Sequence, residues 1–513
     1  MKRRSSSRRR GKVILVGAGP GDPGLITVRG LEAIRQADVI LYDLLVSSEL
    51  MEEFPPGAET IFVGKEAGTH YVDQAETNAL LVQKAKPGKT VVRLKGGDPY
   101  TFGRGGEEAE ACARAGIPFE VVPGITSGLA APAYAGIPVT HRDASSSIAL
   151  ITGHRRSDGT VRTIPAPRAD TLIYYMGVRT LPQIVAALRK EGWPANTPAA
   201  MVHRGTTPRQ LVVAGTLANI VKRATEAQIR HPALVVVGKV AAYRKRLRWF
   251  EDRPLLGRRI LIAQALPEAK ELRDELYRLA AEVTCLPSPA LSLLARTPKL
   301  DAAIKKIQQF QVLLLAHPLA VQVFFQRLAA LGLDARALSH LELAACGRAA
   351  RSALEAKQLH CDFQLPLDLD PKSVPPVFNS VAAVFNRYRK KKILFPDTLP
   401  GPNSLLQALN KIRAEVTLVP AYAAQPAPAL TKVPVHQELI VFPARQGVED
   451  LLSQVILPIY VHLAALGPAP ASALQARGLT PTFSLRSLDT ASAVAAILQW
   501  ASKHRPRKTK PSD

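Results

Sequence analysis

The stretch RLKGGDPYTFGRGGEE, residues 93–108, decides which fold we predict for the first half of this chain. The apolar run Val91–Leu94 leads into it, as expected of a strand, and the two glutamates at its end begin a helical pattern. Five glycines follow the strand, at positions 96, 97, 103, 105 and 106. Because glycine has no Cβ, it adopts positive φ angles and lets a backbone approach a ligand closely. Such a density of glycine favours a ligand-binding loop over an ordinary turn.

Two further loops of small residues also follow predicted strands. GAGPGDPG, residues 17–24, comes after the run Val13–Val16, and PGITSG, residues 123–128, comes after Val121–Val122. The first loop is not a dinucleotide-binding fingerprint, because the third glycine of that motif would fall at Asp22. A Gly/Pro turn without a ligand is the alternative for it. Loops that follow parallel strands converge at the carboxyl edge of a sheet, so the sequence predicts one site built from three loops.

Outward from these loops, residues 12–240 alternate β-branched runs with helical patterns. This alternation indicates an α/β fold with mainly parallel strands. After the basic stretch 244–248 a second α/β pattern begins, in which a strand, a helix and the letters AEVT occur twice. The repetition predicts two related lobes, one from residues 254–290 with 431–502 and the other from 291–430. The predicted divisions of the whole chain are a disordered basic tail at 1–11, domains at 12–245 and 257–502, a linker at 246–256, and a second basic tail at 503–513.

The chain is strongly basic, with 67 Lys and Arg against 42 Asp and Glu and a net charge of +25. Residues 1–12 carry +7 and residues 501–513 carry +4, which leaves +14 for the remainder. A charge of this size favours an acidic partner, such as nucleic acid, anionic lipid or a polycarboxylate. Four cysteines without a metal-binding spacing are typical of a reducing cytoplasm. The apolar stretches are too short or too interrupted to cross a membrane, so we expect a soluble cytoplasmic protein.

Residues 12–245 resemble the tetrapyrrole methylase family, and within it the uroporphyrinogen-III C-methyltransferases. Two strings carry the resemblance, RLKGGDPYTFGRGGEE and VGAGPGDPGLITVRG at 16–30. The resemblance implies two α/β lobes with S-adenosylmethionine in the cleft between them, and a homodimer. It also implies methylation of uroporphyrinogen III at C2 and C7 to give precorrin-2, without a metal, on a route to sirohaem or cobalamin.

The same resemblance assigns site residues by motif. It implies Asp43 as a proton acceptor and Lys65 as a proton donor, and it implies His70, Arg104 and Arg142 as substrate-binding residues. The cofactor contacts that it implies are Pro20, Gly96, Gly97, Asp98, Thr101, Thr126, Ser127, Met176 and Gly205. The plainer alternatives are a loop-capping Asp43, a structural His70 and ordinary surface charges at the Lys and Arg positions.

Residues 254–502 resemble uroporphyrinogen-III synthase, a family whose two lobes are joined by a two-strand hinge. The matching pieces are PLLGRRILIAQA, AEVTCLPS, KKILFPD with AEVTLVPAY, and LAALGPAPASALQARGL. Tyr422 matches a tyrosine thought to assist loss of the substrate hydroxyl, and the alternative for it is an aromatic residue packed on the hinge. The resemblance implies hydroxymethylbilane as a second substrate.

Several positions depart from that synthase pattern. The chain has Ala316-His317-Pro318 and Pro443-Ala444 where Thr-Ser pairs are usual, Asp397 where an Arg is usual, and Ala469 where a hydroxyl residue is common. These changes remove anion-binding groups. The sequence therefore leaves open whether the second half cyclises hydroxymethylbilane or is a non-catalytic tetrapyrrole-binding scaffold.

A last alternative is RNA methylation, which another branch of the methylase family performs. The basic tails favour it, whereas the string at 93–108 and the synthase-like half oppose it. We expect a tetrapyrrole with eight carboxylates, and neither nucleic acid nor a membrane, as the partner of this basic chain.

Overall fold

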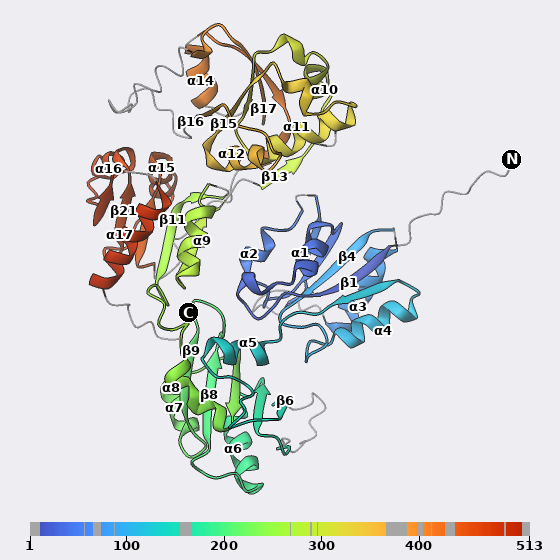
Figure 1. The fold of residues 1–513 in the computed structure, drawn as a ribbon, viewed down its shortest axis with the longest axis vertical. Coiled ribbons are helices and arrows are strands. Elements are labelled where there is room, and N and C mark those ends of the chain that lie inside the picture. The colour runs from blue at the N-terminus through green and yellow to red at the C-terminus, as the bar shows by residue number, and fades with distance from the viewer. Residues whose placement is uncertain are drawn as a thin grey trace, which may run out of the picture. The chain divides into compact units, whose positions relative to one another are not determined.

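The computed structural model describes residues 11–55, 57–64, 73–86, 88–153, 166–266, 268–287, 290–294, 296–365, 387–398, 404–411, 413–425, 437–486 and 489–504. The predicted basic tails lie outside these residues except at positions 11, 503 and 504. The chain forms two compact units that divide between Arg258 and Arg259, and each has its own sheets and cores (Figure 1). No helix among the described residues combines the length and the apolar character that a membrane span requires.

The first sheet of the first unit is entirely parallel, with the order β3-β2-β4-β1-β5. Its strands are β1 (Lys12–Gly17), β2 (Val39–Tyr42), β3 (Glu59–Phe62), β4 (Thr90–Lys95) and β5 (Phe119–Val122). The helices around it are η1 (Pro23–Leu25), α1 (Val28–Arg35), α2 (Ser48–Met51), α3 (Gln74–Ala85) and α4 (Gly105–Arg114). Alternate residues of β1 serve two cores: Val13 and Leu15 pack with α3 and α4, whereas Ile14 and Val16 pack with α1 and α2 (Figure 1). Because both faces are covered, the strands are apolar along most of their length.

The second sheet of this unit has the order β6-β7-β10-β8-β9. Its strands are β6 (Ile148–Thr152), β7 (Thr171–Tyr175), β8 (Pro198–His203), β9 (Leu211–Thr216) and β10 (Ala233–Val237). Only β6 and β7 pair in parallel, so the prediction of mainly parallel strands is wrong for this sheet. The connection between β8 and β9 is only residues 204–210, too short for the crossover that a parallel pair needs. The helices of this lobe are α5 (Ser127–Tyr134), α6 (Leu181–Lys190), α7 (Ile220–Glu226), η2 (Lys239–Tyr243) and α8 (Arg244–Leu247).

The segment 246–256, predicted as a linker, packs on the first unit. Phe250 and Leu255 are buried, and the ring centroid of Phe250 lies 4.9 Å from that of Tyr134. Glu251 forms an ion pair with Arg244 at 2.8 Å. The first unit therefore extends to Arg258, beyond the predicted end of its domain.

The second unit contains two parallel five-stranded sheets joined by a two-stranded ribbon. One sheet, ordered β12-β11-β20-β21-β22, consists of β11 (Arg259–Ala265), β12 (Glu282–Leu286), β20 (Leu439–Phe442), β21 (His462–Leu466) and β22 (Phe483–Leu485). The other, ordered β16-β15-β14-β17-β18, consists of β14 (Val312–Leu315), β15 (Glu342–Cys346), β16 (Phe363–Leu365), β17 (Lys392–Asp397) and β18 (Glu415–Pro420). The ribbon pairs β13 (Ala290–Leu293) with β19 (Tyr422–Gln425) in antiparallel fashion. This arrangement confirms the predicted division into two lobes and the hinge between them.

Helices cover both sheets of the second unit (Figure 1). With the first sheet go α9 (Lys270–Arg278), α15 (Arg445–Leu452), α16 (Pro468–Gln475) and α17 (Thr490–Lys503). With the second go α10 (Pro298–Lys305), η3 (Ile307–Gln309), α11 (Pro318–Ala330), η4 (Ala335–Leu338), α12 (Gly347–Glu355) and α14 (Ser404–Lys411). The largest core of this unit lies between α11 and its sheet, where Phe324 and Leu315 are fully buried.

Candidate active site

Three loops at the carboxyl edge of the first sheet meet through their backbones. They follow β1, β4 and β5, which are neighbours in the sheet. Gly19 and Gly97 exchange two backbone hydrogen bonds, with N···O distances of 3.2 and 2.6 Å. The Gly124 N–H donates to Asp98 Oδ2 at 3.2 Å. The predicted convergence of the three loops is therefore confirmed.

The loops come together so closely that side chains cannot fit between them. A Cβ on Gly124 would lie 2.2 Å from the carbonyl oxygen of Gly97, and a Cβ on Gly17 would lie 2.5 Å from the Gly124 nitrogen. Gly97 also has a φ of +70°, which favours glycine. The floor of the candidate site consequently presents backbone N–H and C=O groups.

Asp98 holds the second loop in shape. Its Oδ1 accepts the Tyr100 N–H at 3.0 Å and the Thr101 hydroxyl at 2.9 Å. Together with the Gly124 contact, three of the carboxylate's roughly four lone-pair sites are used inside the protein. Asp98 and Thr101, both predicted as cofactor contacts, are thus bonded to each other, and about one acceptor site of the carboxylate is left for a ligand.

Tyr175, the last residue of β7, connects the second lobe of this unit to the loops. Its hydroxyl lies 2.6 Å from Thr126 Oγ1 and accepts the Gly128 N–H at 2.8 Å. Burial raises the pKa of Tyr175. Phe102 of the second loop packs on the same ring, with 4.8 Å between centroids. The next residue, Met176, has a φ of +56° and is 46% exposed, so this strand end lies open beside the second and third loops.

The loop between β8 and β9 meets the first loop. Thr206 Oγ1 accepts the Asp22 N–H at 3.1 Å, and the Tyr134 hydroxyl donates to Asp22 Oδ2 at 2.8 Å. Gly205 packs tightly on α5, because a Cβ there would lie 2.3 Å from the Cβ of Ala131. Two lobes of one unit therefore close around the three loops.

The residues predicted to contact the cofactor all lie on these connected segments. Pro20 is in the first loop, Gly96, Gly97, Asp98 and Thr101 are in the second, Thr126 and Ser127 are in the third, and Met176 and Gly205 are in the second lobe. Their contact with a cofactor stays a prediction. Sequence reasoning missed Asp22, Tyr134 and Tyr175, which join the lobes.

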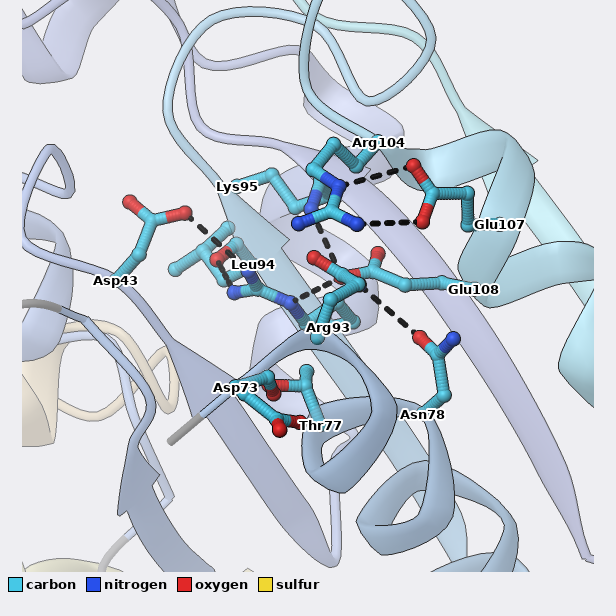
Figure 2. A network of polar contacts seen from close by, with 11 residues as sticks. Asp43, Asp73, Thr77, Asn78, Arg93, Leu94, Lys95, Arg104, Glu107 and Glu108 are labelled. Atoms are coloured by element: carbon cyan, nitrogen blue, oxygen red, sulfur yellow. Dashed lines mark hydrogen bonds and ion pairs between the residues drawn. The ribbon is translucent and has the colours of Figure 1, made fainter. Parts of the chain in front are cut away.

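Asp43 follows β2 and remains partly exposed, with 23% of its side chain accessible. Its Oδ1 accepts the Leu45 N–H at 3.1 Å, and its Oδ2 lies 3.4 Å from an Arg93 NH2 group (Figure 2). The carboxylate therefore caps its loop, as the alternative proposed, and also faces a buried cation. Lys65 and His70, predicted as proton donor and substrate-binding residue, lie outside the described residues.

A buried charge network lies behind Asp43 (Figure 2). Glu108 of α4 is fully buried, and its Oε1 accepts from Arg93 Nε at 3.1 Å, Lys95 Nζ at 2.9 Å and Gln74 Nε2 at 3.2 Å. Burial, followed by the nearby Arg93 charge, lowers the pKa of Lys95. Sequence reasoning missed this network, although Arg93 and Lys95 interrupt an otherwise apolar strand and buried charges need partners.

The two predicted substrate-binding arginines differ in their surroundings. Arg104 has a φ of +59° and forms a two-bond ion pair with Glu107, at 2.9 and 2.7 Å, just after the second loop (Figure 2). The hydrogen bond from Arg104 lowers the pKa of Glu107. Arg142 is exposed in the turn from His141 to Ser145, and no contact recorded for the described residues joins it to the three loops.

The second unit has a buried tyrosine–carboxylate pair at its hinge. The Tyr422 hydroxyl donates to Asp397 Oδ1 at 2.6 Å, and the two residues are only 5% and 8% exposed. Burial, followed by the Asp397 charge, raises the pKa of Tyr422. The position at which the synthase pattern has an Arg thus holds a carboxylate that binds the predicted catalytic tyrosine.

His317 lies beside this pair, with its ring centroid 5.7 Å from that of Tyr422. Its Nδ1 accepts the Leu319 N–H at 3.0 Å and so caps the start of α11. Burial lowers the pKa of His317 to about 4. A neutral histidine therefore caps α11 at a position where the synthase pattern has a Thr-Ser pair.

Comparison with known proteins matches the two units to two different families. The family model of tetrapyrrole (corrin/porphyrin) methylases matches residues 12–221, and that of uroporphyrinogen-III synthase HemD matches residues 270–455. The porphyrin biosynthesis protein HemD of Ruminiclostridium josui is 37% identical over 459 residues, which are 87% of this chain and 89% of the relative.

Other relatives match the first unit alone. A uroporphyrinogen-III C-methyltransferase of Priestia megaterium is 54% identical over 45% of this chain and 99% of its own length. The crystal structure of a uroporphyrin-III-C-methyltransferase from Thermus thermophilus is 39% identical and covers 46% of this chain and 99% of that one, with a TM-score of 0.41.

Proposed function

The chain belongs to the tetrapyrrole methylase family and carries a uroporphyrinogen-III synthase domain after it, and on that premise we propose that the first unit methylates uroporphyrinogen III. The reaction is the transfer of methyl groups to C2 and C7 to give precorrin-2. The observation that carries the proposal is the floor of three loops, closed by a second lobe through Tyr175 and Thr206, with Asp43 at the end of the neighbouring strand β2. The relatives are named for porphyrin and sirohaem synthesis, so they give no support to RNA methylation.

The floor fits S-adenosylmethionine, which supplies an electrophilic methyl group when bound. Backbone C=O groups and the remaining Asp98 acceptor suit ammonium and ribose hydroxyl groups. Exposed apolar side chains, Ile125 and Met176, suit the flat adenine and the carbons beside the sulfonium. The residues proposed to hold the cofactor are Pro20, Gly96, Gly97, Asp98, Thr101, Thr126, Ser127, Met176 and Gly205.

Asp43 is proposed to accept the proton that the macrocycle loses. When a pyrrole carbon takes a methyl group from a sulfonium, the macrocycle becomes cationic and releases one proton to become neutral again, and a positioned carboxylate is a competent acceptor. Asp43 is exposed enough to be reached, while the Leu45 N–H and Arg93 hold both of its oxygens. The donor role of Lys65 and the substrate contact of His70 rest on the resemblance alone.

The substrate's eight carboxylates account for basic residues near the loops. Arg104 is about half exposed and pairs with Glu107, so it can exchange that partner for a substrate carboxylate. Arg142 is proposed as a second contact on the strength of the resemblance, which also supports a homodimer and a cytoplasmic location.

For the second unit, cyclisation of hydroxymethylbilane to uroporphyrinogen III is the first candidate function, because its product would be the substrate of the first unit. A non-catalytic, tetrapyrrole-binding scaffold is the second candidate. The Tyr422–Asp397 hydrogen bond favours the scaffold, since a hydroxyl bound to a buried carboxylate is a poor proton donor to a substrate.

The purified full chain tests both proposals. With uroporphyrinogen III and S-adenosylmethionine we expect precorrin-2, identified by mass and absorption spectrum; no methylated tetrapyrrole would refute the proposed function. With hydroxymethylbilane in place of uroporphyrinogen III, methylated product indicates an active synthase unit. If only the preformed macrocycle is methylated, the second unit is a scaffold.

A further inference from the structure

Resting on the proposed role of Asp43, we propose that Arg93 is a positioning residue for the reaction. It holds the Asp43 carboxylate in the orientation that accepts the proton, and the buried Glu108 fixes Arg93 in turn. The chain of contacts runs from α4 through β4 to the end of the neighbouring strand β2 (Figure 2).

All three nitrogens of the Arg93 guanidinium donate hydrogen bonds. Nε donates to Glu108 Oε1 at 3.1 Å, NH1 donates to the Leu94 carbonyl at 2.9 Å, and NH2 donates to Asp43 Oδ2 at 3.4 Å. Only 7% of the side chain is exposed. A planar group with three separate acceptors has one orientation, so the position of its NH2 group is set before any substrate arrives.

Glu108 supplies the charge that keeps this arrangement in a buried place. Its Oε1 accepts hydrogen bonds from Arg93, Lys95 and Gln74, while its Oε2 has no hydrogen-bond partner among the described residues. The two cations and the two carboxylates, with Asp43 as the second, cancel in formal charge. A member that moved away would leave an uncompensated buried charge, which is strongly unfavourable. Each member of the network is therefore held in place by the others.

The same network reaches both ends of the second loop. Lys95 precedes the loop and Glu108 lies in the first turns of the helix after it, and the two join at 2.9 Å. Glu108 Oε1 therefore binds both Arg93, which holds Asp43, and Lys95, which stands at the start of the proposed cofactor loop. The proposed proton acceptor and the proposed methyl-donor site share one rigid support.

Arg93 acts through Asp43 and does not itself carry the proton. A guanidinium stays protonated at any working pH and has no acceptor site. Its effect on catalysis must therefore disappear when Asp43 can no longer accept a proton, whereas a merely structural role would persist.

A double-mutant cycle tests this difference in the full chain, with uroporphyrinogen III and labelled S-adenosylmethionine at enzyme excess, so that slow transfer is still measured. We expect Arg93→Lys to lower the single-turnover rate by about 10- to 100-fold, and by less than about threefold in an Asp43→Asn background. The affinity for S-adenosylhomocysteine and the thermal unfolding temperature should change little. Arg114→Lys, at an exposed ion pair on α4, the helix that carries Glu108, is the control and should leave the rate unchanged.

Equal losses in both backgrounds would overturn the proposal, as would full activity of Arg93→Lys. If Arg93→Lys does not fold, Glu108→Gln replaces it, with an expected loss of about 3- to 10-fold that again disappears in the Asp43→Asn background. Wild-type protein without methylation would refute the proposed function instead, and an Asp43→Asn variant with wild-type rate would refute the base and Arg93's role together.

Discussion

The two units of this chain place carboxylates at the ends of parallel strands in opposite ways. In the first unit Asp43 is partly exposed and is held from behind by a buried cation. In the second unit Asp397 is buried, and its partner Tyr422 is buried with it. A group that exchanges a proton with a substrate must be reachable, whereas a buried hydrogen-bonded pair mainly stabilises the fold. The contrast therefore fits the proton-acceptor role proposed for Asp43, and it sets that role against a tyrosine whose hydroxyl is bound to a buried carboxylate.

The sharpest test of that comparison exchanges each carboxylate for its amide. We expect Asp43→Asn to lower methyl transfer by about 10²- to 10⁴-fold, the range for loss of a general base, without change in S-adenosylhomocysteine affinity. Asp397→Asn should leave methyl transfer within twofold. Methyl transfer assays of both variants check this, and a fully active Asp43→Asn would end the comparison.

The next largest effect concerns the backbone floor of the first unit. Gly124→Ala should weaken S-adenosylhomocysteine binding by about 10- to 100-fold, because its Cβ would meet the Gly97 carbonyl oxygen at 2.2 Å. Gly106→Ala is the matched control, since a Cβ there has nothing within 4 Å. Calorimetry on both variants measures the difference. Equal affinities would show that the close approach of the loops is not needed for binding.

Tyr422→Phe probes the second unit. We expect its free energy of unfolding to fall by about 1.5–3 kcal/mol, because the buried, charged Asp397 carboxylate loses the hydrogen bond that the Tyr422 hydroxyl donates to it. Methyl transfer by the first unit is the internal control and should not change. Denaturant unfolding and a hydroxymethylbilane assay are read together. A loss of cyclisation far beyond the loss of folded protein would break the comparison, since it would make Tyr422 a proton donor.

The smallest effect is a pH dependence at the same hinge. His317 has a pKa of about 4 in the folded unit against 6.5 when unfolded, so the unfolded chain binds a proton first as pH falls. The second unit should lose about 1–2 kcal/mol between pH 6.5 and 4, less than the full shift implies because the ring is partly exposed. Hydrogen exchange of α11 measures the loss.

His317→Asn should remove that dependence, since Asn caps a helix without titrating. His340→Asn, at an exposed position, should keep it. A dependence that survives in His317→Asn would place the titrating group elsewhere.

Much of this arrangement follows from local sequence. The glycines of 93–108 and the strand before them predict the loop and its place at the sheet edge, because glycine spacing acts over a few residues. The mixed pairing of the second sheet does not follow, because β10 pairs antiparallel with β7 and β8, and local patterns do not specify partners so far apart in the chain. The roles of Tyr175 and Tyr134 could not be predicted either, because the residues that bind their hydroxyl groups, Thr126 and Asp22, lie far from them in the chain. The Arg93–Glu108 contact shows only when β4 and α4 are packed together.

The glycine contacts of the floor also restrict how this chain can change over generations. A Cβ at Gly17 would collide with Gly124 and with Gly97, and a Cβ at Gly124 would collide with both of the others. No alanine at one of these positions can be accommodated by a smaller residue at another, because none is smaller than glycine. Mutations at these three glycines therefore lack compensating partners, and we expect all three to stay glycine together.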